Sequence, residues 1–118
     1  MQKETMEQLK EVYEILLTTL EDFICDIVDF YRLKTKVTAI KNCINQVIPK
    51  VPTNLRSSDL ILHSLRGLDC AADSLDICLS SEVLNFPVTY YWVGRCITIL
   101  SDILIQIDCI LGRGDDEP

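Results

Sequence analysis

A chain of 118 residues with 48% hydrophobic residues is long enough for one folded core, and a second independent core is not expected. The apolar content excludes a disordered chain, and only four glycines and four prolines exclude a collagen-like one. The net charge of −7 disfavours direct nucleic-acid binding, because phosphate contacts need clustered lysine and arginine. We expect one domain over residues 1–112 and an acidic disordered tail at 113–118.

The first segment, residues 4–48, contains neither glycine nor proline and repeats large apolar residues every three or four positions. This spacing predicts amphipathic α-helix. One helix of this length would be roughly 65–70 Å long at about 1.5 Å per residue, which is long for such a small domain. Two helices over 4–33 and 35–48, with a break near residue 35, would be more compact. We slightly favour the single helix, because its acidic first half and basic second half suit the helix dipole.

The charges of this first segment are strongly asymmetric. Residues 1–31 hold eight acidic residues and two lysines, whereas residues 32–50 hold five basic residues and no acidic one. The basic stretch has two interpretations. It is a patch for an acidic partner segment, or it is solvated or paired with acidic faces of the same chain, which is the more ordinary outcome. The candidate patch consists of Arg32, Lys34, Lys36 and Lys41.

Prolines mark the two connections that follow. Pro49 and Pro52 end the first segment, since a proline biases the residue before it away from helix, and Pro87 fits the first turn of a last helix. Between them, apolar spacing predicts a helix over 58–80 that begins after a serine N-cap. Gly67 lies inside this helix, where glycine costs up to ~1 kcal/mol relative to alanine. Its simplest interpretation is a close approach between two helices.

The last segment, residues 88–111, is almost entirely apolar but carries Asp102 and Asp108. Its apolar residues recur three and four apart and both aspartates fall off that stripe, so we expect a helix with Leu100 in the core and Asp102 facing outward. Because most of its circumference is apolar, we expect it to be the central helix. The fold predicted from these segments is an all-α up-down bundle of three or four helices.

Six cysteines bear on the cellular compartment. The chain has no CxxC pair and no Cys/His spacing typical of a zinc site, and each cysteine lies in an apolar run, where a free thiol behaves as a small hydrophobe. We expect reduced, buried cysteines and an intracellular protein, cytoplasmic or nuclear. The polar N-terminus does not resemble a signal peptide, and no apolar run has the length of a membrane span.

Catalytic and metal-binding patterns are missing from the sequence, and we expect no enzyme, cofactor or metal. The only histidine, His63, lies about 10 Å along a helix from Cys70, too far for a hydrogen bond between a nucleophile and its base. Asp69, Asp73 and Asp76 lack the compact loop spacing of a calcium site and are interpreted as a solvated helix face.

The sequence therefore favours a non-catalytic interaction domain, a dimerisation, scaffold or adaptor module that binds itself or captures a helix or peptide. Aromatic residues and arginine dominate interface energetics, and residues 86–95 contain four aromatic residues, including the only tryptophan. The alternative is a secreted, disulfide-bonded carrier of a small apolar ligand. The candidate partner contacts are Tyr90, Tyr91, Trp92 and Arg95, with Tyr13, Leu17 and Ile24 on a second stripe of the first helix.

Overall fold

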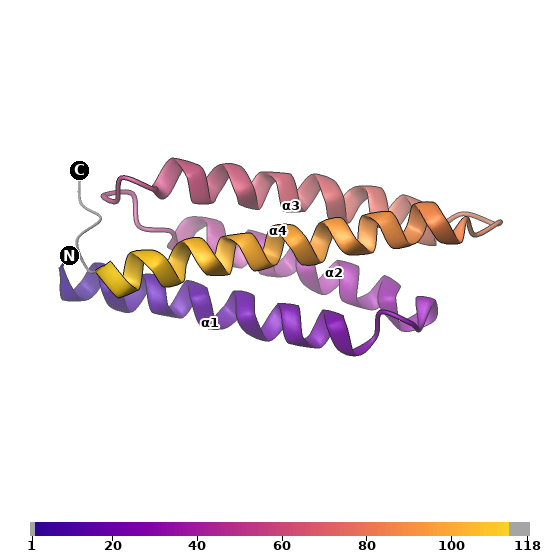
Figure 1. Cartoon of the computed structure of the whole chain (residues 1–118), viewed down its shortest axis with the longest axis horizontal. Coiled ribbons are helices and arrows are strands. Elements are labelled where there is room, and N and C mark those ends of the chain that lie inside the picture. Colours follow the sequence, from indigo (N-terminus) through magenta and orange to yellow (C-terminus); the bar gives the residue numbers. More distant parts are fainter. Residues whose placement is uncertain (1, 114–118) are drawn as a thin grey trace.

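The chain folds into four α-helices that lie side by side and run in alternating directions (Figure 1). A computed structural model describes residues 2–113. The bundle extends 50 × 21 × 20 Å, and the described residues contain no strand. The predicted all-α up-down bundle is confirmed; most of the predicted tail lies outside the described residues. The elements are α1 (Lys3–Cys25), α2 (Phe30–Val47), the short 3-10 helix η1 (Ile48–Lys50), α3 (Ser58–Leu79) and α4 (Phe86–Arg113).

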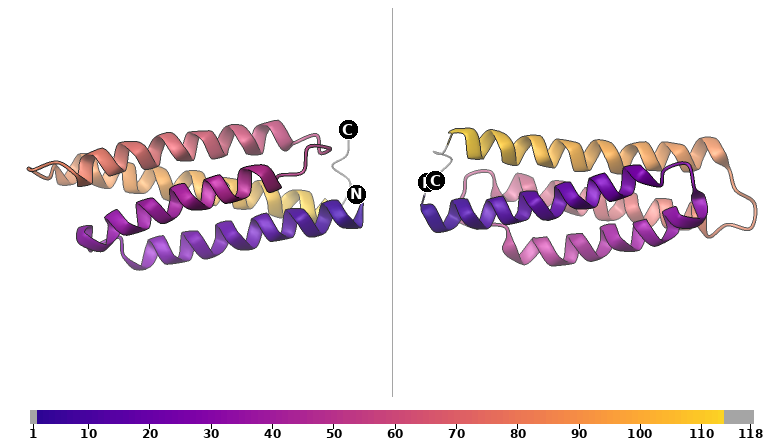
Figure 2. Two further views of the ribbon diagram at one scale, coloured as in Figure 1. Left: turned by 180° about the vertical axis from the view of Figure 1, so that it is seen from behind. Right: turned by 90° about the horizontal axis from the view of Figure 1, so that it is seen from below.

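Each helix packs mainly on two antiparallel neighbours. Helices α1 and α3 both contact α2 and α4, so that α2 and α4 occupy opposite corners of the bundle (Figure 2). The prediction that the last helix is central is therefore wrong. Helix α4 occupies one of the four corners of the bundle. The apolar residues on its outward side therefore face solvent and are not covered by another helix.

One apolar stripe from each helix fills the core. Leu16, Ile40, Leu68 and Leu100, one from each helix, are all fully buried. Asp102, two positions after Leu100, is exposed. The helical phase predicted for the last segment is therefore confirmed.

The first segment breaks at residues 26–29, earlier than predicted, and the single long helix is wrong. The Asp29 carboxylate accepts hydrogen bonds from the backbone N–H groups of Tyr31 at 3.1 Å and Arg32 at 3.3 Å. This side chain satisfies N–H groups that the first turn of a helix leaves without partners, and so begins α2. The reversal packs the stripes of α1 and α2 against each other, which one extended helix would not allow.

The later connections agree more closely with the sequence. Helix α3 follows Ser57 at the N-cap position, and the Ser58 hydroxyl donates a hydrogen bond to the Pro52 carbonyl. Helix α4 begins where the Asn85 side chain accepts a hydrogen bond from the Val88 N–H at 3.1 Å. Pro87 lies in this first turn, as predicted. No helix within residues 2–113 is long and apolar enough to cross a membrane.

Gly67 does not mark a close contact between helices. It is exposed, and a Cβ atom added to it would have no neighbour within 4 Å.

The cysteines also differ from expectation. All six are free of disulfides, but only Cys43 and Cys96 are buried; Cys78 is half-buried, and the rest are exposed. A helix with two neighbours leaves about half of its circumference to solvent, and an apolar run does not show which half. The three exposed cysteines are Cys25, Cys70 and Cys109.

A candidate partner-binding surface at the apolar end

The exposed apolar residues gather at one end of the bundle. At this end the connection 26–29 joins α1 to α2, and the connection 80–85 joins α3 to α4 (Figure 1, right-hand side). Nine of the eleven exposed large apolar side chains among the described residues lie in these helix ends and connections. We call this set the apolar end. Its members are Ile24, Val28, Tyr31, Ile77, Val83, Phe86, Val88, Tyr90 and Tyr91.

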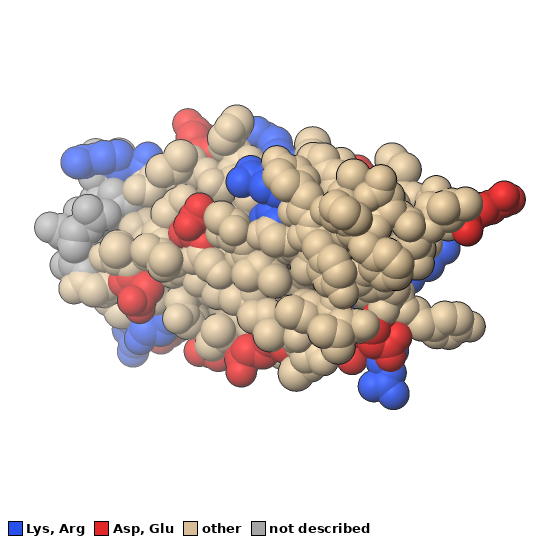
Figure 3. Space-filling view, turned by 45° about the vertical axis from the view of Figure 1, so that its right-hand side comes forward, with Lys and Arg blue, Asp and Glu red and all other residues tan. Residues whose placement is uncertain are grey.

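The apolar end is about as large as the largest apolar patch of a typical monomer. Tyr31 is 94% exposed, Tyr91 59%, Phe86 56% and Tyr90 43%. Since an aromatic side chain carries about 150–250 Å² of surface, these four rings present roughly 500 Å². The largest apolar patch of a typical monomer is about 300–600 Å². Figure 3 shows a broad area without Lys, Arg, Asp or Glu between the middle and the right of the face in view, with charged side chains at its edges.

Aromatic contacts order this end. The Phe30 ring at the start of α2 stacks on Phe86 of α4 with centroids 5.3 Å apart, and it meets Tyr90 at 5.0 Å. Because α2 and α4 occupy opposite corners, these rings close the end of the bundle between them. Tyr91 packs edge-on against Trp92 at 5.0 Å. The exposed rings therefore stand on a packed aromatic base.

A cavity of about 520 Å³ lies beside these rings. Phe30, Leu79 and Leu84 give it apolar walls, and Tyr31, Lys34 and Thr35 add two hydroxyl groups and one ammonium group. Ligand pockets in proteins occupy about 300–1,000 Å³, and they combine apolar walls with a few polar groups. The cavity fits this description.

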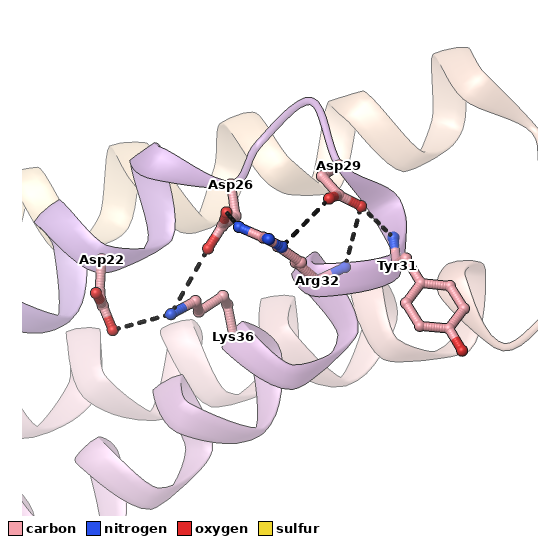
Figure 4. Close-up of polar contacts among 6 residues, drawn as sticks. All are labelled: Asp22, Asp26, Asp29, Tyr31, Arg32 and Lys36. Atoms are coloured by element: carbon pink, nitrogen blue, oxygen red, sulfur yellow. Dashed lines mark hydrogen bonds and ion pairs between the residues drawn. The ribbon is translucent and has the colours of Figure 1, made fainter.

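A cluster of charges holds the connection between α1 and α2 (Figure 4). Lys36 Nζ lies 3.2 Å from Asp22 and 3.6 Å from Asp26, and Arg32 lies 3.7 Å from Asp26 and 3.5 Å from Asp29. The hydrogen bond from Lys36 to Asp22 raises the pKa of the lysine. Single surface ion pairs contribute about 0–1 kcal/mol, but shared partners make this cluster a network. It fixes the connection that carries Val28 and leads into the first turn of α2, where Tyr31 lies.

The basic stretch is used mainly inside the chain. Besides Arg32 and Lys36, Lys41 forms an ion pair with Asp73, which raises the pKa of the lysine, and Lys50 Nζ lies 2.6 Å from Glu11. The charges that link α2 and η1 to α1 and α3 are thus neutralised in place. Lys34 is the exception. It is exposed and has no hydrogen bond or ion pair from its side chain within the described part of the chain.

The structure brings some of the predicted contact residues together and separates others. Tyr90, Tyr91 and Ile24 belong to the apolar end, and Arg95 is exposed one turn further along α4. Trp92, by contrast, is half-buried against the core. Two others are half-buried against the core as well: Tyr13 and Leu17.

Sequence reasoning missed Phe30 and Tyr31. It placed both inside a continuous helix, where nothing distinguishes them from other members of the apolar stripe. Asp29 was the available signal, because aspartate is favoured at helix N-caps. Reading it as an N-cap would have moved both aromatic residues to a helix end.

A smaller apolar site lies at the opposite end. Leu60 and Ile105, the two remaining exposed large apolar residues, line a cavity of about 250 Å³ together with Cys109 and Gln106. The Gln106 Oε1 atom is buried and has no hydrogen-bond partner among the described residues. Those residues also contain no group of three or more histidine, cysteine or acidic side chains placed to hold a metal ion. The apolar end is therefore the stronger candidate site.

Comparisons of the chain with protein-family models, with curated proteins and with solved structures find no significant match.

Proposed function

We propose that this chain is a non-catalytic protein-interaction domain that binds a partner protein through the apolar end. The observation that carries the proposal is the concentration of exposed large apolar side chains at that end, four of them aromatic. Aromatic residues are enriched among those that dominate binding energy. Apolar patches of this size, when exposed, commonly mark interaction sites.

The magnitudes favour a surface that needs a well-fitted partner. Burying roughly 500 Å² of aromatic surface is worth about 12 kcal/mol at ~25 cal/mol per Å². Association costs about 4–15 kcal/mol in lost freedom of motion. The four rings alone therefore give weak binding, and the adjacent cavity and aliphatic residues supply the contacts that make it selective.

The partner segment docks onto helices. Residues 2–113 contain no strand, so this part of the chain offers no sheet edge for an added strand. The aromatic base and the ion-pair cluster hold the apolar end in one arrangement, which lowers the ordering cost of binding. The six cysteines, which form no disulfide, support an intracellular, reducing setting for this domain.

The test compares two ends of the molecule. One variant carries Tyr31→Asp with Tyr91→Asp, and the control carries Ile105→Asp at the opposite end. All three side chains are more than half exposed, so melting temperatures should stay close to that of the wild type. Affinity capture from native extract, with a photo-crosslinking residue at position 83 in all three proteins, identifies what binds the apolar end. Sedimentation over a range of concentrations measures self-association.

We expect the wild type and the Ile105→Asp control to retain a crosslinked partner that the double variant loses. A wild type that stays monomeric and crosslinks to nothing would overturn the proposal. So would a partner that the double variant binds equally well.

A further inference from the structure

Building on this proposed function, we propose that the partner is an acidic peptide segment that places a large apolar side chain in the 520 Å³ cavity and a carboxylate against Lys34. Lys34 lines that cavity together with the apolar walls of Phe30, Leu79 and Leu84. An apolar pocket with one cation at its edge suits an apolar group that has an acid beside it.

The contrast among five neighbouring cations carries the argument. Arg32, Lys36, Lys41 and Lys50 all form ion pairs with acidic residues of this chain. Lys34 alone in the basic stretch forms none among the described residues, and it alone of the five lines the cavity. The chain neutralises the cations between its helices and leaves unpaired the one at the candidate site.

Helix geometry explains why Lys34 does not share the acids that pair with Lys36. At about 3.6 residues per turn, two positions on a helix lie roughly 200° apart. Arg32 and Lys36 therefore share one side of α2, facing the acids of the α1 connection, whereas Lys34 lies on the other side, one turn after Phe30 (Figure 4 shows the first side). The acids that serve Lys36 do not reach around α2.

The charge of the partner follows from this arrangement. A basic segment would meet Lys34 with a like charge, and an uncharged segment would leave it without a partner. A carboxylate at an exposed lysine contributes to selectivity and association rate more than to affinity. The apolar side chain in the cavity supplies the binding energy, and Lys34 selects acidic segments among apolar ones.

The test is a selection from a phage-displayed library of random 16-residue peptides. The bait proteins are the wild type, Lys34→Glu, Lys10→Glu and the Tyr31→Asp, Tyr91→Asp double variant. Lys10 is a matched control, because it is exposed on α1 outside the apolar end and has no ion pair among residues 2–113. Both lysine variants change the net charge equally. Dodecanoate is titrated separately as a free apolar acid, and sedimentation detects a second copy.

We expect peptides enriched on the wild type and on Lys10→Glu to combine large apolar residues with more aspartate and glutamate than the unselected library. Selection on Lys34→Glu should reverse the preference toward lysine and arginine. An enriched wild-type peptide should bind Lys34→Glu roughly tenfold more weakly and Lys10→Glu with nearly unchanged affinity.

Three results would overturn the inference. Peptides that lose binding in the double variant but show no acidic preference would leave the apolar end as a binding surface without charge selection. Saturable dodecanoate binding that needs Lys34, without peptide enrichment, would make the occupant a free apolar acid. Self-association that blocks the cavity would make it a second copy. If no peptide distinguishes the wild type from the double variant, the inference falls; the proposed function falls with it only if the wild type also stays monomeric and captures no partner that the double variant loses.

Discussion

Helices α2 and α4 occupy opposite corners of one bundle and differ in the interactions that their side chains form outside the core. Helix α2 and η1 are joined by ion pairs to Asp22 and Glu11 on one side and to Asp73 on the other. Helix α4 forms no ion pair within the described residues, and Tyr91 and Ile105 stand exposed on it. Both helices bury a stripe in the same core. The comparison indicates that the inner stripe specifies the fold, whereas the outer residues decide what each surface offers. Ion pairs cover much of α2, and apolar side chains stay exposed on α4 and at the start of α2.

The inner and outer sides of α4 should respond most differently to charge. Leu100→Asp places an unpaired carboxylate in the core, which costs several kcal/mol against a total stability of about 5–15 kcal/mol. We expect this variant to lose its helical circular dichroism or to aggregate. Asp102→Ala, on the outer side, should change the free energy of unfolding by less than about 0.5 kcal/mol. A folded Leu100→Asp protein would show that the stripe of α4 is not core.

Alkaline pH should act through the buried thiols, Cys96 of α4 above all, rather than through the ion pairs of α2. Burial also raises the pKa of Cys43 on α2, in the same direction. Burial raises the pKa of Cys96 from 9.0 to about 12. The folded state thus keeps a proton that the unfolded chain loses above pH 9, so stability falls as pH rises between these values. The slope is about 1.4 kcal/mol per pH unit, or about 4 kcal/mol in all. Lys36 and Lys41, whose folded pKa values are raised above 10.5, lose their contribution only at higher pH.

Denaturant unfolding at pH 8 and at successive values up to about 11 measures this slope. Cys96→Ala should lower stability at pH 8, because it leaves a small cavity, but flatten the decline above pH 9. Cys109→Ala, at an exposed thiol, is the control and should keep the wild-type slope. An equal slope in Cys96→Ala would assign the alkaline loss to other groups.

Trp92 and Tyr91 are adjacent on α4 and should separate stability from binding. Fully buried tryptophan costs about 3–5 kcal/mol when replaced by alanine, so the half-buried Trp92 should cost roughly 1–3 kcal/mol. Tyr91→Ala should cost about 1 kcal/mol or less, mainly its edge contact with Trp92. We expect Tyr91→Ala to weaken partner binding with little change in thermal stability. If Trp92→Ala weakens binding without lowering stability, the ring belongs to the surface and not to the core.

Replacing Gly67 or Gly94 by alanine should raise the stability of the protein, since an added Cβ meets nothing within 4 Å at either position. Each alanine substitution should stabilise the free protein by about 0.5–1 kcal/mol. Gly94 lies one turn beyond Tyr90 on α4, whereas Gly67 lies on α3 away from the apolar end. Gly94→Ala is therefore expected to weaken binding of a partner that extends along α4, and Gly67→Ala is not. Calorimetry and binding assays on both variants check this.

The smallest effect concerns salt. The Debye screening length shortens to about 3 Å at ~1 M salt. The attraction within exposed ion pairs is therefore weaker at high salt. The double variant Lys36→Met, Lys41→Met should show a smaller salt-induced change in melting temperature than the wild type, because the pairs of Lys36 and Lys41 are already gone. Arg95→Gln on α4, where no such pair exists among the described residues, should follow the wild type. Equal salt responses in all three proteins would mean that the pairs of α2 contribute nothing measurable.

The parts of the fold that the sequence predicts are those set by local spacing. The phase of α4 follows from its own residues, since Leu100 and Asp102 fall on opposite sides of one helix. The break at 26–29 does not, because Phe23, Ile27, Phe30 and Leu33 continue the three-and-four spacing through it. A chain reversal that leaves the three-and-four spacing of apolar residues unbroken cannot be detected from that spacing. Only the helix-capping residue, Asp29, marks it.

The apolar end was predictable in part for a related reason. Tyr90 and Tyr91 stand out as an aromatic cluster within one segment. Their combination with Phe30 and Tyr31 depends on the antiparallel packing that brings helix ends together, and a sequence does not display that packing. Nor does apolar content distinguish a helix that is covered by other helices of its own chain from one that leaves apolar residues exposed. For this reason the sequence predicts, wrongly, that α4 is the central helix.

An even number of antiparallel helices returns the chain to the end where it began. The start of α1 at Lys3 and the last residue of α4, Arg113, lie at the same pole of a molecule 50 Å long, and the apolar end forms the other pole (Figure 1). Any tether attached at either position leaves the binding pole pointing away from the anchor. The domain can thus be immobilised or fused through either of these positions without covering its aromatic rings. A host protein joined to both positions would hold the domain with its apolar end projecting outward.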